Sequence, residues 1–187
     1  MSPPGRPRSA ECDRAILDAT LSCYGDSGFA GLTIDAVAEK AGVSKATIYR
    51  RYPTKADLVF EAVAEFSGRD ESPPDTGSLR GDLVELTRRM ARVLGNPEMQ
   101  CVVRNMSADL ARYHDFAEAH EVYVERKRAG TRAVLDAAVA RGDIAGYDLD
   151  LVTDLMLGPL FFRVLFRRKK VDRAFLDTIA DSVIAEL

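Results

Sequence analysis

Residues 42–55, GVSKATIYRRYPTK, place five hydroxyl side chains and four cations in one short stretch. Val43, Ala46 and Ile48 are its small apolar set, enough to pack one side of a short helix while the other side stays polar. Hydroxyls and cations are the donors that proteins direct at phosphate oxygens and at the acceptor edges of bases. The composition of this stretch therefore favours contact with a nucleic acid.

The charge along the chain allows such a partner. The 187 residues carry a formal net charge of −3, but five cations and no acid stand from Lys40 to Lys55. An electrostatic footprint on nucleic acid is a local patch, so an acidic chain as a whole does not exclude it.

Two short helices with a tight turn between them are predicted around this stretch. Thr33 caps the first and Ser44 the second, which we expect to run to Tyr52, where Pro53 ends it. Gly42 allows the turn a positive φ. This is the pattern of a helix-turn-helix, whose second helix fits the major groove. The residues left to project outward are the expected DNA contacts: Thr33, Ser44, Lys45, Thr47, Tyr49, Arg50, Arg51, Tyr52 and Lys55.

Residues 32–58, LTIDAVAEKAGVSKATIYRRYPTKADL, closely resemble the DNA-binding domain of the tetracycline-repressor (TetR) family, and the resemblance covers about residues 10–66. It implies a bacterial one-component regulator, most often a repressor, that binds an inverted-repeat operator as a homodimer and is released by a small inducer. Tyr49 matches the family's usual tyrosine. Arg50 and Arg51 stand where a histidine or an aromatic residue is common, so we expect them to help set this protein's DNA preference.

Residues 1–9 are predicted to be a flexible basic arm. Arg6 and Arg8, held extended by Pro7, could enter the minor groove beside the recognition helix, while a disordered tail without DNA contacts is the alternative.

The apolar spacing predicts an all-α protein of about nine helices. We expect a helix-turn-helix domain over residues 1–66, a linker over 67–77 and a ligand-binding and dimerisation domain over 78–187. The first helix should stop at Gly28, and Pro159 should kink the helix predicted from Leu149 to Arg167.

The C-terminal half carries two further expectations. Its last two helices are apolar on more than one face, and the resemblance implies a dimer interface there; the candidates are Leu155, Leu160, Val164, Phe175, Ile179 and Val183. The resemblance also implies an inducer pocket, for which the candidates are Met90, Arg104, Asn105, Met106, Phe116, Tyr123, Phe161 and Phe162.

The alternatives are an all-α enzyme, or a small-molecule-binding protein with an incidental helix-turn-helix. The two histidines, His114 and His120, lack the Glu-x-x-His spacing of a carboxylate-bridged metal bundle, and no P-loop or nucleophile elbow is present. We therefore expect no catalytic residues, no metal and no cofactor. Three cysteines without a C-x-x-C pair favour buried, reduced thiols over a redox sensor. Without a membrane span or a signal peptide, a cytoplasmic location is expected.

Overall fold

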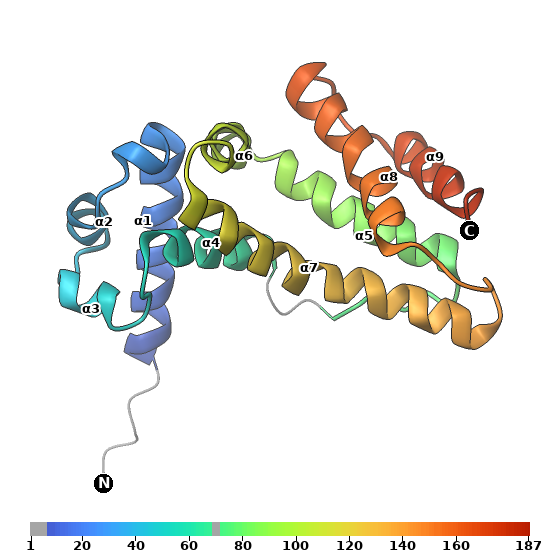
Figure 1. Ribbon diagram of the computed structural model, residues 1–187, viewed down its shortest axis with the longest axis horizontal. Helices are drawn as coiled ribbons and strands as arrows, with labels where there is room; N and C mark the ends of the chain where they lie inside the picture. The colour runs from blue at the N-terminus through green and yellow to red at the C-terminus, as the bar shows by residue number, and fades with distance from the viewer. Residues whose placement is uncertain (1–6, 69–71) are drawn as a thin grey trace, which may run out of the picture. The chain divides into compact units, whose positions relative to one another are not determined.

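The computed structural model describes residues 7–68 and 72–187 (Figure 1). Within these ranges the chain forms nine α-helices, one π-helical segment and no β-strand, which confirms the predicted all-α class. The elements are α1 (Pro7–Gly31), α2 (Ile34–Ala41), α3 (Lys45–Tyr49), α4 (Lys55–Phe66), α5 (Leu79–Leu94), α6 (Pro97–Leu110), α7 (His114–Arg141), α8 (Leu149–Phe161), η1 (Phe162–Phe166) and α9 (Arg173–Ile184).

The helices divide between two compact units. Unit 1 holds α1 to α4 together with residues 101–123, which include most of α6 and the start of α7. Unit 2 holds α5, the first residues of α6, the rest of α7, α8, η1 and α9. Residues 101–123 belong to unit 1 because Phe116 packs its ring against Tyr24, Phe29 and Phe60 of α1 and α4. The linker predicted at residues 67–77 stays a prediction.

Helix α1 forms the centre of unit 1. It buries Ile16, Leu21 and Tyr24 at helical spacing, and both α2 and α4 pack on it. At Gly28 the backbone takes φ 65°, and α1 is kinked there. The predicted end at Gly28 is thus a kink, after which one more helical turn reaches Gly31.

The start of α1 bears on the predicted basic arm. The helix already begins at Pro7, so residues 7–9 are helical. Residues 1–6 and the side chain of Arg8 lie outside what the structure describes, and so do the minor-groove contacts predicted for Arg6 and Arg8.

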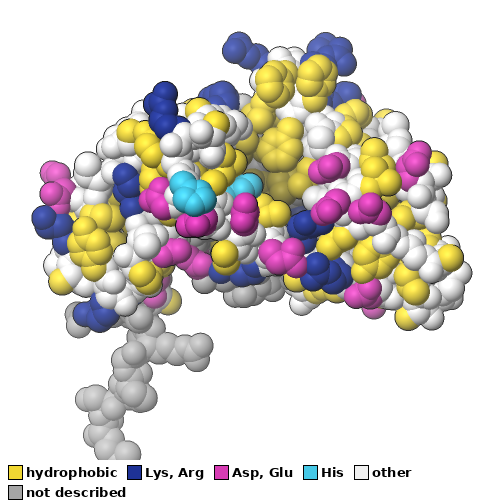
Figure 2. All heavy atoms as spheres, viewed as in Figure 1, with side chains coloured by type: hydrophobic (Ala, Val, Ile, Leu, Met, Phe, Trp, Pro, Cys, Tyr) yellow, Lys and Arg dark blue, Asp and Glu magenta, His cyan; other side chains and the backbone are white. Residues whose placement is uncertain are grey.

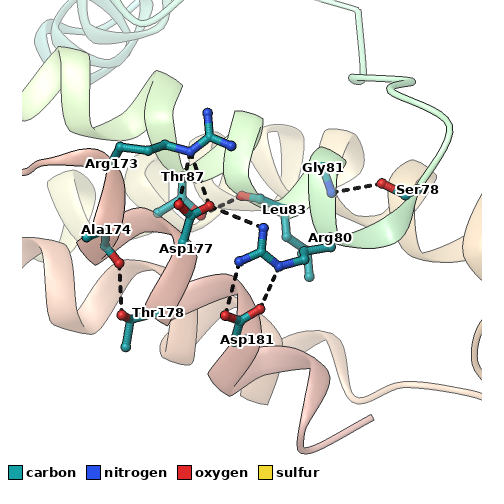
Figure 3. A network of polar contacts seen from close by, with 10 residues as sticks. All are labelled: Ser78, Arg80, Gly81, Leu83, Thr87, Arg173, Ala174, Asp177, Thr178 and Asp181. Atoms are coloured by element: carbon teal, nitrogen blue, oxygen red, sulfur yellow. Dashed lines mark hydrogen bonds and ion pairs between the residues drawn. The ribbon is translucent and has the colours of Figure 1, made fainter.

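Unit 2 is built from α5, α8 and α9, which pack on one another through residues such as Leu83, Leu160 and Ile179. An exposed set of ion pairs, the Arg80 network, ties α5 to α9 (Figure 3). Its arginine Nε lies 2.7 Å from Asp181 and its Nη1 lies 3.3 Å from Asp177, which also pairs with Arg173.

The helix that contains Pro159 is shorter than predicted. Helix α8 passes through the proline to Phe161, and the hydrogen-bond pattern then becomes π-helical, with the Arg167 N–H donating to the Phe162 carbonyl at 3.0 Å. Proline has no N–H to donate and crowds the preceding turn, yet the α pattern continues through Pro159 and changes only at Phe162. The segment predicted to be α-helical to Arg167 is α-helical only to Phe161.

Candidate nucleic-acid interface

The helix-turn-helix is built by two capped helices and one glycine. Thr33 Oγ1 accepts from the Ala36 N–H at the start of α2, and Ser44 Oγ accepts from the Thr47 N–H at the start of α3, each at 3.2 Å. Between them, Gly42 has φ 67° and directs the chain into α3. Each cap satisfies an N–H that the first turn of a helix leaves free, so both helix starts are determined locally.

The recognition helix is shorter than predicted. We expected it to reach Tyr52, but α3 ends at Tyr49, and the N–H groups of Arg51 and Tyr52 both donate to the Ile48 carbonyl at 2.9 Å. Proline restricts only the residue before it, Tyr52, so the end of α3 at Tyr49 coincides instead with a tight turn in which the Arg51 N–H bonds three residues back to Ile48. Ile48 is fully buried and keeps this short helix packed on its own unit.

Three of the predicted DNA-binding cations have partners within unit 1. Lys45 Nζ lies 2.7 Å from Asp35, an exposed carboxylate on α2 whose hydrogen bond raises the pKa of this lysine. Arg51 Nε lies 2.5 Å from Asp13 of α1. Lys55 Nζ donates to the carbonyls of Phe29 and Leu32, at 2.6 and 3.3 Å.

The side chains of the remaining predicted DNA contacts differ in solvent exposure and in hydrogen bonding. Tyr49 is 58% exposed on α3, and Arg50 is exposed with no hydrogen bond or ion pair from its side chain among the described residues. Thr47 shares a hydrogen bond with Ser44 through their hydroxyls, 3.0 Å apart, and Tyr52 is half-buried. The most accessible groups of the recognition helix are therefore Lys45, Tyr49 and Arg50.

A cluster of hydrogen bonds holds the C-terminal end of α1, which leads into α2 of the helix-turn-helix. Asp109 of α6 accepts hydrogen bonds from the Tyr24 hydroxyl at 2.9 Å and the Phe29 N–H at 3.0 Å. Asn105 donates to the carbonyls of Tyr24 and Gly25 at 2.8 and 3.0 Å. We call these four residues, Asp109, Asn105, Tyr24 and Phe29, the Asp109 anchor.

The Asp109 anchor was not predicted from the sequence, although a signal existed. Asp109 continues the buried face of α6 formed by Met99, Val102 and Met106 at helical spacing. An acid on an apolar helix face is rare unless it has buried donors to accept from.

The predicted pocket residues are divided between the two units. Phe116 and Asn105 are committed to the core of unit 1, together with the buried Met106, and Tyr123 stacks on Phe60 there. Arg104 is exposed on α6 and donates to the Cys101 sulfur at 3.1 Å. The other three, Met90, Phe161 and Phe162, lie in unit 2.

The predicted dimer residues are mostly internal to unit 2. Four of them, Leu160, Val164, Ile179 and Val183, are buried within a single chain. Leu155 and Phe175 are half-buried, and the Arg163 guanidinium lies over the Phe175 ring at 4.1 Å.

Three other features concern residues 7–68 and 72–187: possible metal ligands, the cysteines and the apolarity of the helices. No group of three or more His, Cys, Asp or Glu side chains in these ranges could hold a metal ion. Cys12, Cys23 and Cys101 are free thiols that are half-buried, where full burial was expected. None of the described helices has the length and apolar character of a membrane span.

Sequence profiles of known families match both parts of the chain. The profile described as "Bacterial regulatory proteins, tetR family" matches residues 16–62, and "Tetracyclin repressor-like, C-terminal domain" matches residues 73–183. The chain belongs to the TetR family. It is a transcriptional regulator with a helix-turn-helix and a C-terminal ligand-binding domain, in a family of DNA-binding regulators that are not enzymes.

Individual TetR-family relatives agree over almost the full length. An uncharacterised helix-turn-helix transcriptional regulator of Mycobacterium tuberculosis is 33% identical, covering 97% of this chain and 88% of its own. The DNA-binding transcriptional repressor TetR of Mycobacteroides abscessus is 31% identical, covering 98% and 95%. The solved structure of the transcriptional regulator FadR from Bacillus subtilis shares the fold, with a TM-score of 0.70, 16% identity and coverage of 92% and 98%.

Proposed function

We propose that this TetR-family regulator is a repressor that binds an inverted-repeat operator as a homodimer and leaves it when a small molecule binds the C-terminal domain. The observation that carries the proposal is the polar surface of α3, where Tyr49 and Arg50 are exposed beside Lys45 on a helix held from beneath by the buried Ile48. A relative named as a DNA-binding repressor, 31% identical over 98% of this chain, supports the repressor role.

In the proposed complex, α3 enters the major groove, where some side chains contact base edges and others contact phosphates. Lys45, Tyr49 and Arg50 face base edges, since they are the accessible groups of the helix. Lys45 exchanges Asp35 for a DNA acceptor, which is feasible because both partners are exposed. The phosphate contacts fall to the flanking donors: Thr33, Ser44, Thr47, Tyr52, and Lys55 through the proton that its two carbonyl partners leave free.

For the homodimer we propose the exposed face of α8 and η1. Leu151 is 42% exposed, Phe162 59% and Phe166 76%, and Leu155 lies half-buried between them. Figure 2 shows hydrophobic side chains together with Lys and Arg at the η1 end of α8. The predicted interface residues that are buried in unit 2 would support this face from beneath.

The charges at the two ends of α8 favour an antiparallel arrangement of two copies. Acids stand at its N-cap, Asp148, and in its first half, at Asp154, and four exposed cations follow η1 at residues 167–170. Antiparallel pairing sets each basic end against the acidic end of the second copy. A Phe166→Asp variant should sediment as a monomer if this face is the interface, and as the parent does if it is not.

The signal would be a small molecule bound by the C-terminal domain. FadR of Bacillus subtilis was solved with stearoyl-CoA, which supports a ligand site in this fold. For this chain, Met90 and Phe161 are half-buried candidates in unit 2.

Selection of bound sequences from a random duplex DNA pool tests the proposed function. The expected result is an enriched inverted repeat whose half-sites lie about one helical turn apart, roughly 34–36 Å. A pool without enrichment, or an enriched site without two-fold symmetry, would contradict DNA binding by a symmetric dimer.

A further inference from the structure

We infer that the adjacent arginines Arg50 and Arg51 have different roles: Arg50 determines DNA sequence preference, whereas Arg51 is a positioning residue that fastens the end of the recognition helix to α1. The inference rests on the proposed DNA binding and assigns its specificity to one side chain. Consecutive residues of a helix point about 100° apart, so two neighbours at its end face different surroundings.

Arg51 is turned inward and engaged on two sides. Its side chain is 22% exposed, with Nε 2.5 Å from the Asp13 carboxylate on α1. Its Nη1 donates to the Thr47 carbonyl at 3.3 Å, one of the carbonyls left free at the end of α3. The Arg51 guanidinium thus joins the end of α3 to α1, and its partner Asp13 lies 38 positions earlier in the chain.

The surroundings of Arg51 are unsuited to a phosphate. It lies in a groove of about 540 Å³ that is also lined by Asp13, Asp57 and Glu61. Asp13 and Asp57 alone, beside one guanidinium, leave an excess of negative charge, which disfavours a DNA phosphate. Asp57 is held in place as the partner of Thr54 in the cap of α4, so its charge stays in the groove.

Arg50 has the opposite surroundings. Its backbone N–H donates to the Ala46 carbonyl at 3.2 Å, which keeps the residue in line with α3. Its side chain is exposed beside Tyr49, and nothing within the described residues neutralises it. A free guanidinium on a recognition helix has the geometry for bidentate contact with guanine O6 and N7.

Binding of full-length variants to a panel of single-base operator mutants separates the two roles. Arg50→Ala should flatten the preference at one position of each half-site by about tenfold while Tm stays at the parent value. Arg51→Ala and Asp13→Asn should weaken binding to all sequences by a common factor and lower Tm by about 2–4 °C. Arg112→Ala, which removes an exposed arginine of the same unit, is the control for loss of one positive charge.

A charge exchange gives the sharpest test, including the case in which Arg51→Ala folds poorly. In the double variant Asp13→Arg with Arg51→Asp, a positioning role predicts that Tm and the base profile recover relative to Arg51→Asp alone. A DNA-contacting Arg51 predicts no recovery, because an aspartate would then face the DNA. A double variant without recovery would overturn the assignment. So would a base preference that changes in Arg51→Ala but not in Arg50→Ala. If the parent enriches no DNA, the proposed function fails and the role of Arg50 fails with it, while recovery of Tm in the double variant still decides the role of Arg51.

Discussion

Two clusters hold helices together in this protein through aspartate carboxylates. The carboxylate is buried in one cluster and exposed to solvent in the other. In the Asp109 anchor, a carboxylate that is 9% exposed accepts from the Tyr24 hydroxyl and the Phe29 N–H. In the Arg80 network, the aspartates paired with Arg80 have side chains that are 27% and 59% exposed. Water competes for every bond of the network, but it cannot satisfy the donors of the anchor. The anchor should therefore stabilise its unit more, although the network has more ion pairs.

The two clusters also differ in what they support. The Asp109 anchor holds the kinked end of α1, and α1 is the helix on which α2 and α4 pack. The Arg80 network holds α9 to α5 within unit 2 (Figure 3). Changes in the anchor should therefore alter the helix-turn-helix, whereas changes in the network should not.

The largest effect is expected for Asp109→Ala. It leaves two buried donors, on Tyr24 and Phe29, without an acceptor, at a cost of about 2–5 kcal/mol in the free energy of unfolding. Urea denaturation measures it, with Asp115→Ala, an exposed acid of α7, as the control. Equal denaturation midpoints for the two variants would show that the buried Asp109 carboxylate contributes no more to stability than an exposed acid.

Tyr24→Phe should follow, because it removes one bond of the anchor and costs about 1 kcal/mol near neutral pH. Burial, and then the hydrogen bond to Asp109, raise the pKa of Tyr24 well above its usual value of about 10. The folded state holds this proton more tightly than the unfolded state, so its contribution is complete below about pH 10 and is lost as pH rises above it. The difference in unfolding free energy between parent and variant should therefore be present at pH 8 and should shrink near pH 11. Parallel pH profiles would exclude this linkage.

Gly28→Ala should cost about 1–3 kcal/mol, less than Asp109→Ala. At φ 65° and ψ −173° the backbone lies in a region that is open almost only to glycine, while the alanine Cβ would lie at an ordinary 3.5 Å from the nearer Asp109 oxygen, so the cost is one of backbone conformation. Gly130→Ala is the matched control, since it lies inside α7 with open space around it and ordinary φ. Thermal unfolding measures the stability of both variants. If Gly28→Ala were as stable as Gly130→Ala, alanine would not be strained at the kink.

The smallest effect is expected for Arg80→Ala. Its ion pairs are exposed, so the loss of stability should lie well below that of Asp109→Ala and should vanish when about 1 M salt screens the charges. DNA affinity should stay at the parent value. A salt-independent loss as large as that of Asp109→Ala would reverse the ranking of the two clusters.

The short-range features of the DNA-binding region could be predicted from the sequence. Thr33, Gly42 and Ser44 occupy the cap and turn positions expected of them, because each acts on atoms within a few residues of itself. The length of α3 was overestimated, since Pro53 was expected to end the helix only at Tyr52. The helix ends earlier, at a tight turn in which the Arg51 N–H bonds to the Ile48 carbonyl, and propensities did not reveal this turn.

The partners of the projecting side chains could not be predicted in the same way. A list of outward-facing cations treats Lys45, Arg50 and Arg51 as equivalent, yet one is paired on the surface, one is free and one is turned toward Asp13. Nor does an apolar stripe say whether it faces its own unit or a partner, which is why several predicted interface residues proved to be buried within one chain.

The sequence by itself therefore determined the all-α class and the helix-turn-helix, because caps, a turn glycine and apolar periodicity act over one or two helical turns. The family followed from the resemblance of residues 32–58 to the TetR DNA-binding domain. Only the tertiary structure decided that Asp109 accepts from Tyr24 and that Arg51 pairs with Asp13. These partners lie 85 and 38 positions apart in the chain, and a contact over that distance exists only after the cores have packed.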